Sequence, residues 1–514
     1  RNLQFSTETI YKEAFNLNFR RWTGDAEDEM EGAPELCGGG GRRRAVPGAP
    51  RCTARLAAGG AGGDLGGGGL SDADLAALRQ RIDGLRAIES ATWRRVSEGG
   101  GAVPPGRLRG SLTALGDGSR RLCLFGGVST ESGRMLNSEP GRGGEGDGRT
   151  GEWHRVTPQG ALPPGRAHHD AVVVGGRWLV VHGGLLDSGC RDDDTWRLDL
   201  WASRPAWEQL GLGPVVGMAA PRPVPRFHHS LVTTEDGKIV LFGGHSWQRE
   251  ALDDAWVMDL GEEGSLPASL TLWREIGGAQ RPEARAYHAM SAVGRQVVVS
   301  GGELQDGGGS AELWALDTRT EEWCRVDAGE SGWAADARGG AGRMRHATCH
   351  LGHGVLAVCG GHGGTASEPR PTRCQVLRLA EGGEARMSCR LLQRLQGSAA
   401  AQAEELPPGE AGPRLEATLL RLPEGPLVLF GGNTGELTDE FGDGYHQRGP
   451  AETLVADVAG GGDLGEWREA SRGAPKLFAA LGCSVAALAE TSEVVVVDTP
   501  VGSGPVRVHA LMLR

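Results

Sequence analysis

The chain has 514 residues, 86 of them glycine, and a formal net charge of -12 at pH 7. This acidic balance excludes a broad basic surface for nucleic acid or for an anionic membrane. No apolar run approaches the length of a membrane span, and the high glycine content favours many short strands joined by turns.

Cysteines point to a reducing environment. The ten cysteines are irregularly spaced and form no C-x-x-C pair, and several lie in apolar runs, as Cys123 and Cys359 do. We therefore expect buried, reduced thiols rather than disulfides or a zinc site, and a protein of the cytoplasm or nucleus.

Three segments precede the main part of the chain. Within residues 1–31, ETIYKEAFNLNFRRW has aromatic and apolar residues at a helical spacing, and residues 32–70 have the glycine-rich composition of a flexible linker. Residues 71–90 begin with Ser and Asp and continue with regularly spaced apolar residues: Leu75, Leu78, Ile82, Leu85 and Ile88. This pattern predicts an amphipathic helix, which we expect to pack on the wall of the following domain.

Residues 91–514 repeat one pattern at a spacing of roughly 60 residues. Six apolar runs end in a glycine pair, and the first members of these pairs are Gly126, Gly183, Gly243, Gly301, Gly360 and Gly431. Arg-x-x-His precedes four of the runs, as RAHH, RFHH, RAYH and RMRH. A spaced tryptophan follows the runs, as Trp153, Trp207, Trp273, Trp323 and Trp467. The pattern predicts a repeating unit of four antiparallel strands.

The apolar runs and glycine pairs follow from strand packing. A sheet buried on both faces needs nearly continuous apolar strands, and a glycine pair allows a bend that a Cβ atom would prevent. Sheets packed radially around an axis bury these faces and leave only short edges exposed. The sequence therefore predicts an all-β fold, a β-propeller with one blade per repeat.

The number of blades depends on the two ends of the array. GCSVAALAETSEVVVVDT, near the C-terminus, fits a seventh unit, but Asp498 and Thr499 replace the glycine pair and no closing tryptophan follows. SATWRRV, around Trp93, has the features of an outermost strand without its own blade. The sequence thus favours seven blades over six, with the strand at Trp93 completing the last sheet.

These motifs resemble kelch repeats. The aromatic segment that ends at Trp22 resembles the last helix of an F-box, although it lacks the leading Leu-Pro of that domain. Together with the junction IESATWRRVSEGGGAVPPGR, the array resembles F-box/kelch proteins of the ZEITLUPE type from plants and algae. Members of that family carry a light-sensing LOV domain, of which this sequence shows no sign.

The recurring histidines suggest a metal site at first sight. A metal needs three or four ligands at one point, whereas one Arg-x-x-His per unit is typical of a structural repeat. No nucleophile elbow, phosphate loop or dinucleotide motif occurs in a strand-to-helix context. We therefore expect no enzyme activity, no metal and no cofactor.

A propeller presents its loops as a rigid binding face. By resemblance to kelch adaptors of ubiquitin ligases, two positions per blade are expected to meet a ligand. The residues two places after the strand-start arginine are Arg109, His168, His228, Tyr287, Arg345 and Glu416. The residues after the glycine pair include His245, Glu303, His362 and Asn433. The alternative is that each is a loop residue without a ligand.

The resemblance implies a substrate receptor of a cullin-RING ubiquitin ligase. The target protein would lie on the loop face, and a complete F-box would bind a Skp-type adaptor and a cullin. The cationic and aromatic residues at the loop positions favour an acidic peptide or loop as the target. The alternative is a kelch scaffold or assembly subunit with no link to ubiquitin. In both cases the partner is a protein, not nucleic acid or a membrane.

Overall fold

The computed structural model describes residues 91–96, 103–116, 121–137, 144–147, 153–212, 214–215, 218–246, 250–261, 264–278, 280–326, 342–352, 354–365, 368–371, 375–381, 387–391, 417–422, 425–432, 453–458, 464–470, 484–488, 493–498 and 506–513. All of these residues belong to one structural unit, which comprises Gly66–Gly382 and Arg386–Arg514. The expected helical segment 1–31, linker 32–70 and helix 71–90 lie outside the described residues. So do the predicted site residues Glu416 and Asn433.

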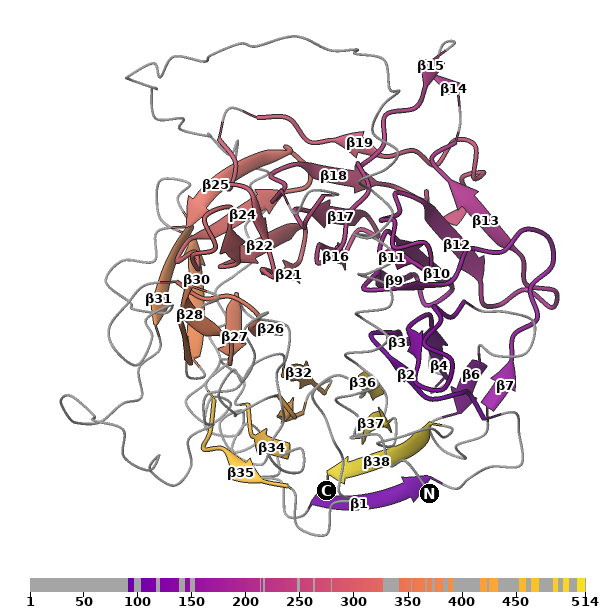
Figure 1. Ribbon diagram of the computed structural model, residues 1–514. Coiled ribbons are helices and arrows are strands. Elements are labelled where there is room, and N and C mark those ends of the chain that lie inside the picture. Colours follow the sequence, from indigo (N-terminus) through magenta and orange to yellow (C-terminus); the bar gives the residue numbers. More distant parts are fainter. Residues whose placement is uncertain are drawn as a thin grey trace, which may run out of the picture. The chain divides into compact units, whose positions relative to one another are not determined.

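The described residues form seven four-stranded antiparallel sheets, numbered here as blades 1 to 7 (Figure 1). Blades 1 to 3 are β3 Ser111–Ala114, β4 Arg121–Phe125, β6 Gly144–Asp147 and β7 Trp153–Arg155; β9 Asp170–Val174, β10 Trp178–His182, β12 Thr195–Asp199 and β13 Trp207–Leu210; β16 Ser230–Thr233, β17 Ile239–Phe242, β18 Ala255–Met258 and β19 Arg274–Glu275. Blades 4 and 5 are β21 Ala289–Val293, β22 Gln296–Ser300, β24 Leu313–Asp317 and β25 Glu322–Val326; β26 Ala347–Gly352, β27 Val355–Cys359, β30 Gln375–Glu381 and β31 Met387–Leu391. Blades 6 and 7 are β32 Thr418–Arg421, β33 Leu427–Phe430, β34 Thr453–Ala456 and β35 Arg468–Glu469; β36 Ser484–Leu488, β37 Glu493–Asp498, β38 Arg507–Leu513 and β1 Ala91–Val96. The predicted all-β propeller is confirmed, and its described sheets number seven rather than six.

The blades close into a ring around a central axis (Figure 1). Their innermost strands contact one another in the order β3, β9, β16, β21, β26, β32, β36, and β36 contacts β3 again. In blade 7 the outermost strand is β1, which pairs with β38 from Ala91 opposite Leu513 to Val96 opposite Val508. Trp93 Nε1 also donates a hydrogen bond of 2.8 Å to the carbonyl oxygen of Ala470 in blade 6. A strand from the beginning of the described chain therefore completes the sheet formed by its end.

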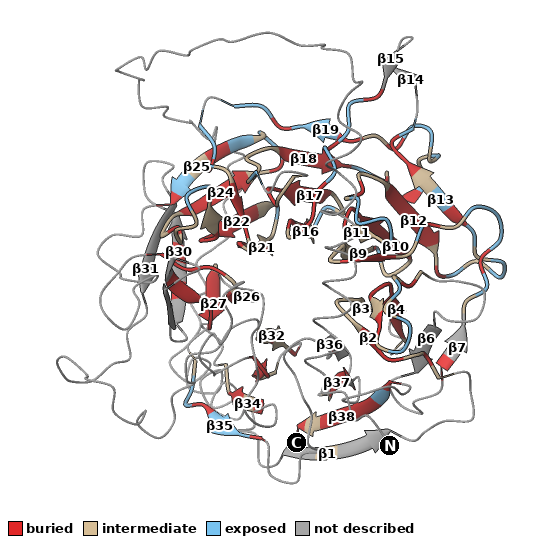
Figure 2. Cartoon of the chain, viewed as in Figure 1, coloured by how far each residue is buried: buried red, intermediate tan, exposed pale blue. Residues whose placement is uncertain are grey.

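The second strand of each blade lies in the core. In β17 the side chains of Ile239, Val240, Leu241 and Phe242 are all 0% exposed. Figure 2 shows buried residues concentrated in the middle strands of the blades, such as β10, β12, β17 and β18, whereas β19 and β35 at the outer wall are exposed. Burial on both faces explains why these strands read as continuous apolar runs instead of alternating ones. Among the described residues, no helix is long and apolar enough to span a membrane.

The glycine pairs lie at the seams between neighbouring blades. Gly243 and Gly244 have φ angles of 62° and 97°. A Cβ atom on Gly243 would lie 2.6 Å from the carbonyl oxygen of Arg285 in blade 4, and one on Gly244 would lie 2.8 Å from the carbonyl oxygen of Phe227 in its own blade. Each glycine is therefore required by a close backbone approach as well as by its left-handed conformation.

One hydrogen bond recurs at these seams. The N–H of the second glycine donates to the carbonyl oxygen of the strand-start arginine in the next blade, at 2.8 to 3.0 Å. The donor and acceptor pairs are Gly127 and Arg166, Gly184 and Arg226, Gly244 and Arg285, and Gly302 and Arg343. Because the bond joins the second strand of one blade to the first strand of the next, it fixes where each inner strand begins.

A glycine substitution tests the importance of the seam. In Gly243→Ala, the alanine must adopt a left-handed φ angle and its Cβ atom clashes with blade 4. In Gly175→Ala, the alanine must adopt a similar φ angle, 59°, but no atom lies within 4 Å of its Cβ atom. We expect Gly243→Ala to lose about 1 to 3 kcal/mol more unfolding free energy than Gly175→Ala, because only it overpacks the structure. Urea denaturation of both variants measures the difference. Equal losses would show that the seam contact contributes nothing.

Deletion of β1 tests ring closure. Removing residues 91–97 leaves β38 as an unpaired edge and separates Trp93 from Phe430, whose ring centroid lies 6.3 Å away. We expect the melting temperature to fall by several degrees, because an edge and an apolar contact become exposed. Differential scanning fluorimetry measures the shift, with a deletion of equal length in the expected linker, residues 32–38, as the control. A melting curve identical to that of the control would contradict closure by β1.

Candidate functional site

Five buried arginines hold the starts of the inner strands. They are Arg107, Arg166, Arg226, Arg285 and Arg343. The Nη1 of each donates to the carbonyl oxygen of the first glycine of its own blade, at 2.9 to 3.0 Å. In blades 2 to 4 an acidic residue also pairs with the guanidinium: Arg166 with Asp192, Arg226 with Asp254, and Arg285 with Glu312. These acids balance the buried positive charges of the arginines.

The residue two places after each arginine has an unusual backbone conformation. Arg109, His168, His228, Tyr287 and Arg345 have φ angles of 59°, 54°, 54°, 50° and 56°. Positive φ is uncommon outside glycine and costs free energy, particularly for bulky side chains. All five side chains are half-buried. The same conformation in five consecutive blades indicates that the propeller presents these side chains in a fixed way.

These five residues lie side by side around the ring, and we call them the loop-face arc. His168 and His228 share a hydrogen bond of 3.1 Å between Nδ1 and Nε2. The rings of His228 and Tyr287 are 4.1 Å apart between centroids, and the guanidinium carbon of Arg345 lies 3.9 Å from the Tyr287 centroid. At the other end, the N–H of His168 donates to the carbonyl oxygen of Arg109 at 3.3 Å. Residues from five blades thus form one continuous surface.

Residues after the glycine pairs form short ladders with the strand starts. The ladders are β2 Arg107–Leu108 with β5 Val128–Ser129, β8 Arg166–Ala167 with β11 Leu185–Leu186, and β20 Arg285–Ala286 with β23 Glu303–Leu304. His245 pairs with Phe227, and its ring centroid is 5.7 Å from that of Tyr287, so it joins the arc. Glu303 is half-buried opposite Ala286. His362 begins β28 His362–Thr365, which pairs with β29 Glu368–Pro371, and its exposed fraction of 1% leaves it little area for contact with a ligand.

The histidines of the arc are neutral at physiological pH. Burial, together with the nearby charge of Arg109, lowers the pKa of His168 to about 3. Burial also lowers the pKa of His228 well below its ordinary value, with further contributions from His168 and Arg109. The positive charge of the arc therefore comes from its arginines. The imidazoles supply neutral rings and nitrogen atoms for hydrogen bonds.

Two residues that the sequence analysis missed extend the arc. Arg191 places its guanidinium carbon 4.6 Å from the ring centroid of Phe227, and that ring is 4.3 Å from His228. Arg191 bridges to Leu185, the residue after the glycine pair, just as Ala251 bridges to His245 and Gly309 to Glu303. In each of these three blades the bridging residue stands six places after the residue that follows the glycine pair. This constant spacing is the sequence signal that could have identified Arg191.

The other histidines of the repeat are structural. His169, His229, His288 and His346 lie at four different seams. His229, for example, packs its ring edge-on against His182 of the preceding blade, and His346 Nε2 is 2.8 Å from Ser300 Oγ. Among the described residues, Asp192, Asp193 and Asp194 lie close enough together to share a cation, but Arg166 and Arg222 pair with the first two.

Acid should destabilise the propeller through its buried histidines. The pKa values of seven histidines lie below the ordinary 6.5: His168, His169, His182, His228, His229, His288 and His346. These histidines take up protons near pH 6.5 in the unfolded chain but only at lower pH in the folded chain. Their contribution to the free energy of unfolding is therefore fully present above pH 6.5 and is lost as the pH drops towards 3. Burial raises the pKa of Asp170 to about 6, which offsets part of this loss because the folded state then binds that proton first.

Melting temperatures measured from pH 7 to pH 4 should therefore decrease steadily. A His288→Phe variant keeps the ring contact with Phe242 but removes one titrating group, so its stability should depend less steeply on pH. A melting temperature that stays constant from pH 7 to pH 4 in the unaltered chain would contradict the neutral state of these histidines.

Comparison with known proteins agrees with this geometry. Residues 214–369 match the family described as KLHDC2/KLHL20/DRC7 Kelch-repeats domain. The chain is 33% identical to Adagio-like protein 3 of Oryza sativa subsp. japonica, over 54% of this chain and 41% of that protein. It is 32% identical to Adagio protein 3 of Arabidopsis thaliana, over 46% of this chain and 36% of that protein. It is also 27% identical to an F-box/kelch-repeat protein of Arabidopsis thaliana, over 44% of this chain and 46% of that protein.

The matches thus span less than half the length of these curated relatives. The family match at residues 214–369 covers the strand starts and glycine pairs of blades 3 to 5. The chain therefore carries a kelch-repeat β-propeller, and its sequence is similar to Adagio proteins and to an F-box/kelch-repeat protein.

Proposed function

We propose that the chain is a substrate receptor of a cullin-RING ubiquitin ligase and holds its target protein on the loop-face arc. The observation that carries the proposal is the left-handed conformation of five consecutive strand-start residues, whose side chains lie side by side. Costly backbone conformations persist where they serve a function. The F-box in the name of the F-box/kelch-repeat relative supports the ligase assignment, because an F-box would dock a Skp-type adaptor and a cullin.

An acidic segment of the target fits the chemistry of the arc. Arg109, Arg191 and Arg345 supply guanidinium groups, which pair with carboxylates through two parallel hydrogen bonds. Tyr287 and the neutral histidines supply flat, half-buried surfaces, and aromatic and arginine side chains dominate protein interfaces. Because the whole chain carries a net charge of -12, a local group of arginines would concentrate acidic ligands at this one place.

The proposal gives the propeller a binding role without catalysis, in the cytoplasm or nucleus where its cysteines stay reduced. A scaffold with no link to ubiquitin is the second candidate, since the acidic composition and the propeller suit it equally. Co-purification with a Skp-type adaptor separates the two. A ligase receptor retains both the adaptor and the target, whereas a scaffold retains its partner alone.

Charge reversal tests the binding face. We expect the double variant Arg109→Glu, Arg345→Glu to retain its acidic partners at least tenfold less well, because two carboxylates replace the guanidinium groups that attract them. Quantitative mass spectrometry of affinity-purified partners measures the loss, with adaptor binding unchanged. Circular dichroism shows whether the variant remains folded.

The matched control is Arg295→Glu, Arg319→Glu, which makes the same change in net charge with two exposed arginines. β24 starts beside the glycine pair of its blade, at the end that carries the arc, so Arg319, which follows β24, lies at the opposite end of the propeller. Arg295 lies in the turn between β21 and β22 at that same opposite end. The control should retain every partner. If both double variants keep the same partners in the same yield, the arc is not the binding face.

A further inference from the structure

Large exposed apolar side chains occur on blades 2 and 3 and on the connection between them. Among the described residues, the large hydrophobic side chains with high exposure are Trp201, Leu212, Val224 and Leu270, at 56%, 56%, 46% and 64%. All four belong to blades 2 and 3 or to their connections. We call Leu212, Val224 and Leu270 the apolar rim: Leu212 and Val224 lie in the connection between blades 2 and 3, and Leu270 precedes Thr271, which accepts a hydrogen bond from Gly211 of that connection. An exposed apolar patch marks an interaction site more often than scattered apolar residues do.

The connection between blades 2 and 3 positions the rim. β13 ends at Leu210 opposite Thr195, beside the glycine pair, and Leu212 follows directly. The chain then forms a hairpin of β14 Pro214–Val215 and β15 Met218–Ala219, which projects outward in Figure 1, and returns to Arg226. Val224 precedes Phe227 of the extended arc by three residues, which span at most about 10 Å. The connection therefore leads from the rim directly into the strand start that carries Phe227 and His228.

Ordered contacts hold the return segment, so its exposure does not reflect a loose loop. Pro223 is buried, and Arg222 pairs with Asp193 at 3.1 Å, two residues from Arg191. The Nε of Arg226 donates to the carbonyl oxygen of Val224 at 3.0 Å. Prolines at alternate positions in APRPVPR restrict the backbone further. Val224 is thus fixed in place with its side chain in solvent.

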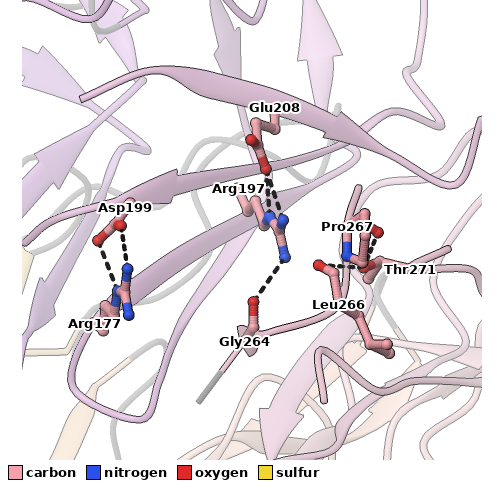
Figure 3. Close-up of polar contacts among 8 residues, drawn as sticks. All are labelled: Arg177, Arg197, Asp199, Glu208, Gly264, Leu266, Pro267 and Thr271. Atoms are coloured by element: carbon pink, nitrogen blue, oxygen red, sulfur yellow. Dashed lines mark hydrogen bonds and ion pairs between the residues drawn. The ribbon is translucent and has the colours of Figure 1, made fainter. Parts of the chain in front are cut away.

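Leu270 is held on the other side of the connection. The N–H of Gly211 donates to the carbonyl oxygen of Thr271 at 3.0 Å. Figure 3 shows the contacts that fix the loop after β18: Thr271 Oγ1 donates to the carbonyl oxygen of Pro267, and Arg197 reaches both Glu208 and the carbonyl oxygen of Gly264. Blade 2 therefore anchors the loop of blade 3 that presents Leu270.

We infer that the apolar rim is a second subsite of the binding face, which takes apolar side chains next to the acidic group of a bound target segment. The inference rests on the proposed function, because the arc must hold the acidic part. The occupant is an extended protein segment whose carboxylates meet Arg191 and its neighbours while adjacent apolar side chains cover Leu212 and Val224. Burial of these side chains on both partners provides affinity, and their position beside the arginines restricts which acidic segments bind.

Selection from a phage-displayed library of random peptides provides the probe. The purified chain should enrich peptides in which Asp or Glu stands beside apolar residues. The variant Leu212→Ser, Val224→Ser should still enrich acidic peptides but lose the apolar preference. A peptide selected by the unaltered chain should bind this variant roughly tenfold more weakly, because two apolar contacts are lost.

Trp201→Ser is the matched control, because its side chain has the same 56% exposure as Leu212. Trp201 follows β12, which starts beside the glycine pair and so ends at the opposite end of the propeller. The control should bind the selected peptide as the unaltered chain does. The inference that the rim is a subsite would be contradicted if the unaltered chain selected acidic peptides without an apolar preference. It would also be contradicted if the rim variant bound the selected peptide as tightly as the unaltered chain does. Either result would leave the proposed function intact. A lack of acidic enrichment would overturn both.

Discussion

A hydrogen bond from the second glycine of one blade to the strand-start arginine of the next, present at four seams of the described residues, sets the geometry on which the rest of the propeller depends. It occurs where the second strand of one blade meets the first strand of its neighbour, at a distance that leaves no space for a Cβ atom. Each seam fixes the start of an inner strand, and the inner strands in turn contact one another around the ring. Errors at one seam would therefore displace two blades.

One short segment serves both stability and recognition. In blade 3, Arg226 is buried against Gly243, His229 packs on His182 at the seam, and His228 between them lies in the arc. The positive φ of His228 costs free energy, which the contacts of its two neighbours offset. Substitutions at the first and last positions should act mainly on stability, whereas those at the middle position should act mainly on binding. The rim extends the same arrangement outward from Phe227.

Repetition made much of the fold predictable from the sequence. Gly-Gly pairs and Arg-x-x-His motifs recur because every blade has the same seam, and they identified the positions of Arg109, His168, His228, Tyr287 and Arg345. Their chemistry was less accessible, because neutral histidines result from burial and from arginines of other blades. Arg191 was missed because its position becomes significant only when its ring partner, Phe227, is brought to it from the next blade. The six-residue spacing from the residue after the glycine pair marks this position in blades 2 to 4, but the spacing alone does not reveal its contact with a ring from the next blade.

The central claim is that acidic segments bind where the strand starts converge. Amide hydrogen exchange of the full chain with and without a hexaglutamate peptide locates that binding with a probe that carries only carboxylates. Slower exchange is predicted in the strand-start segments 107–110, 166–169, 226–229, 285–288 and 343–346, whose amides and side chains surround the arc. Protection confined to turns at the opposite end, such as 175–177 and 294–295, would contradict binding at the arc.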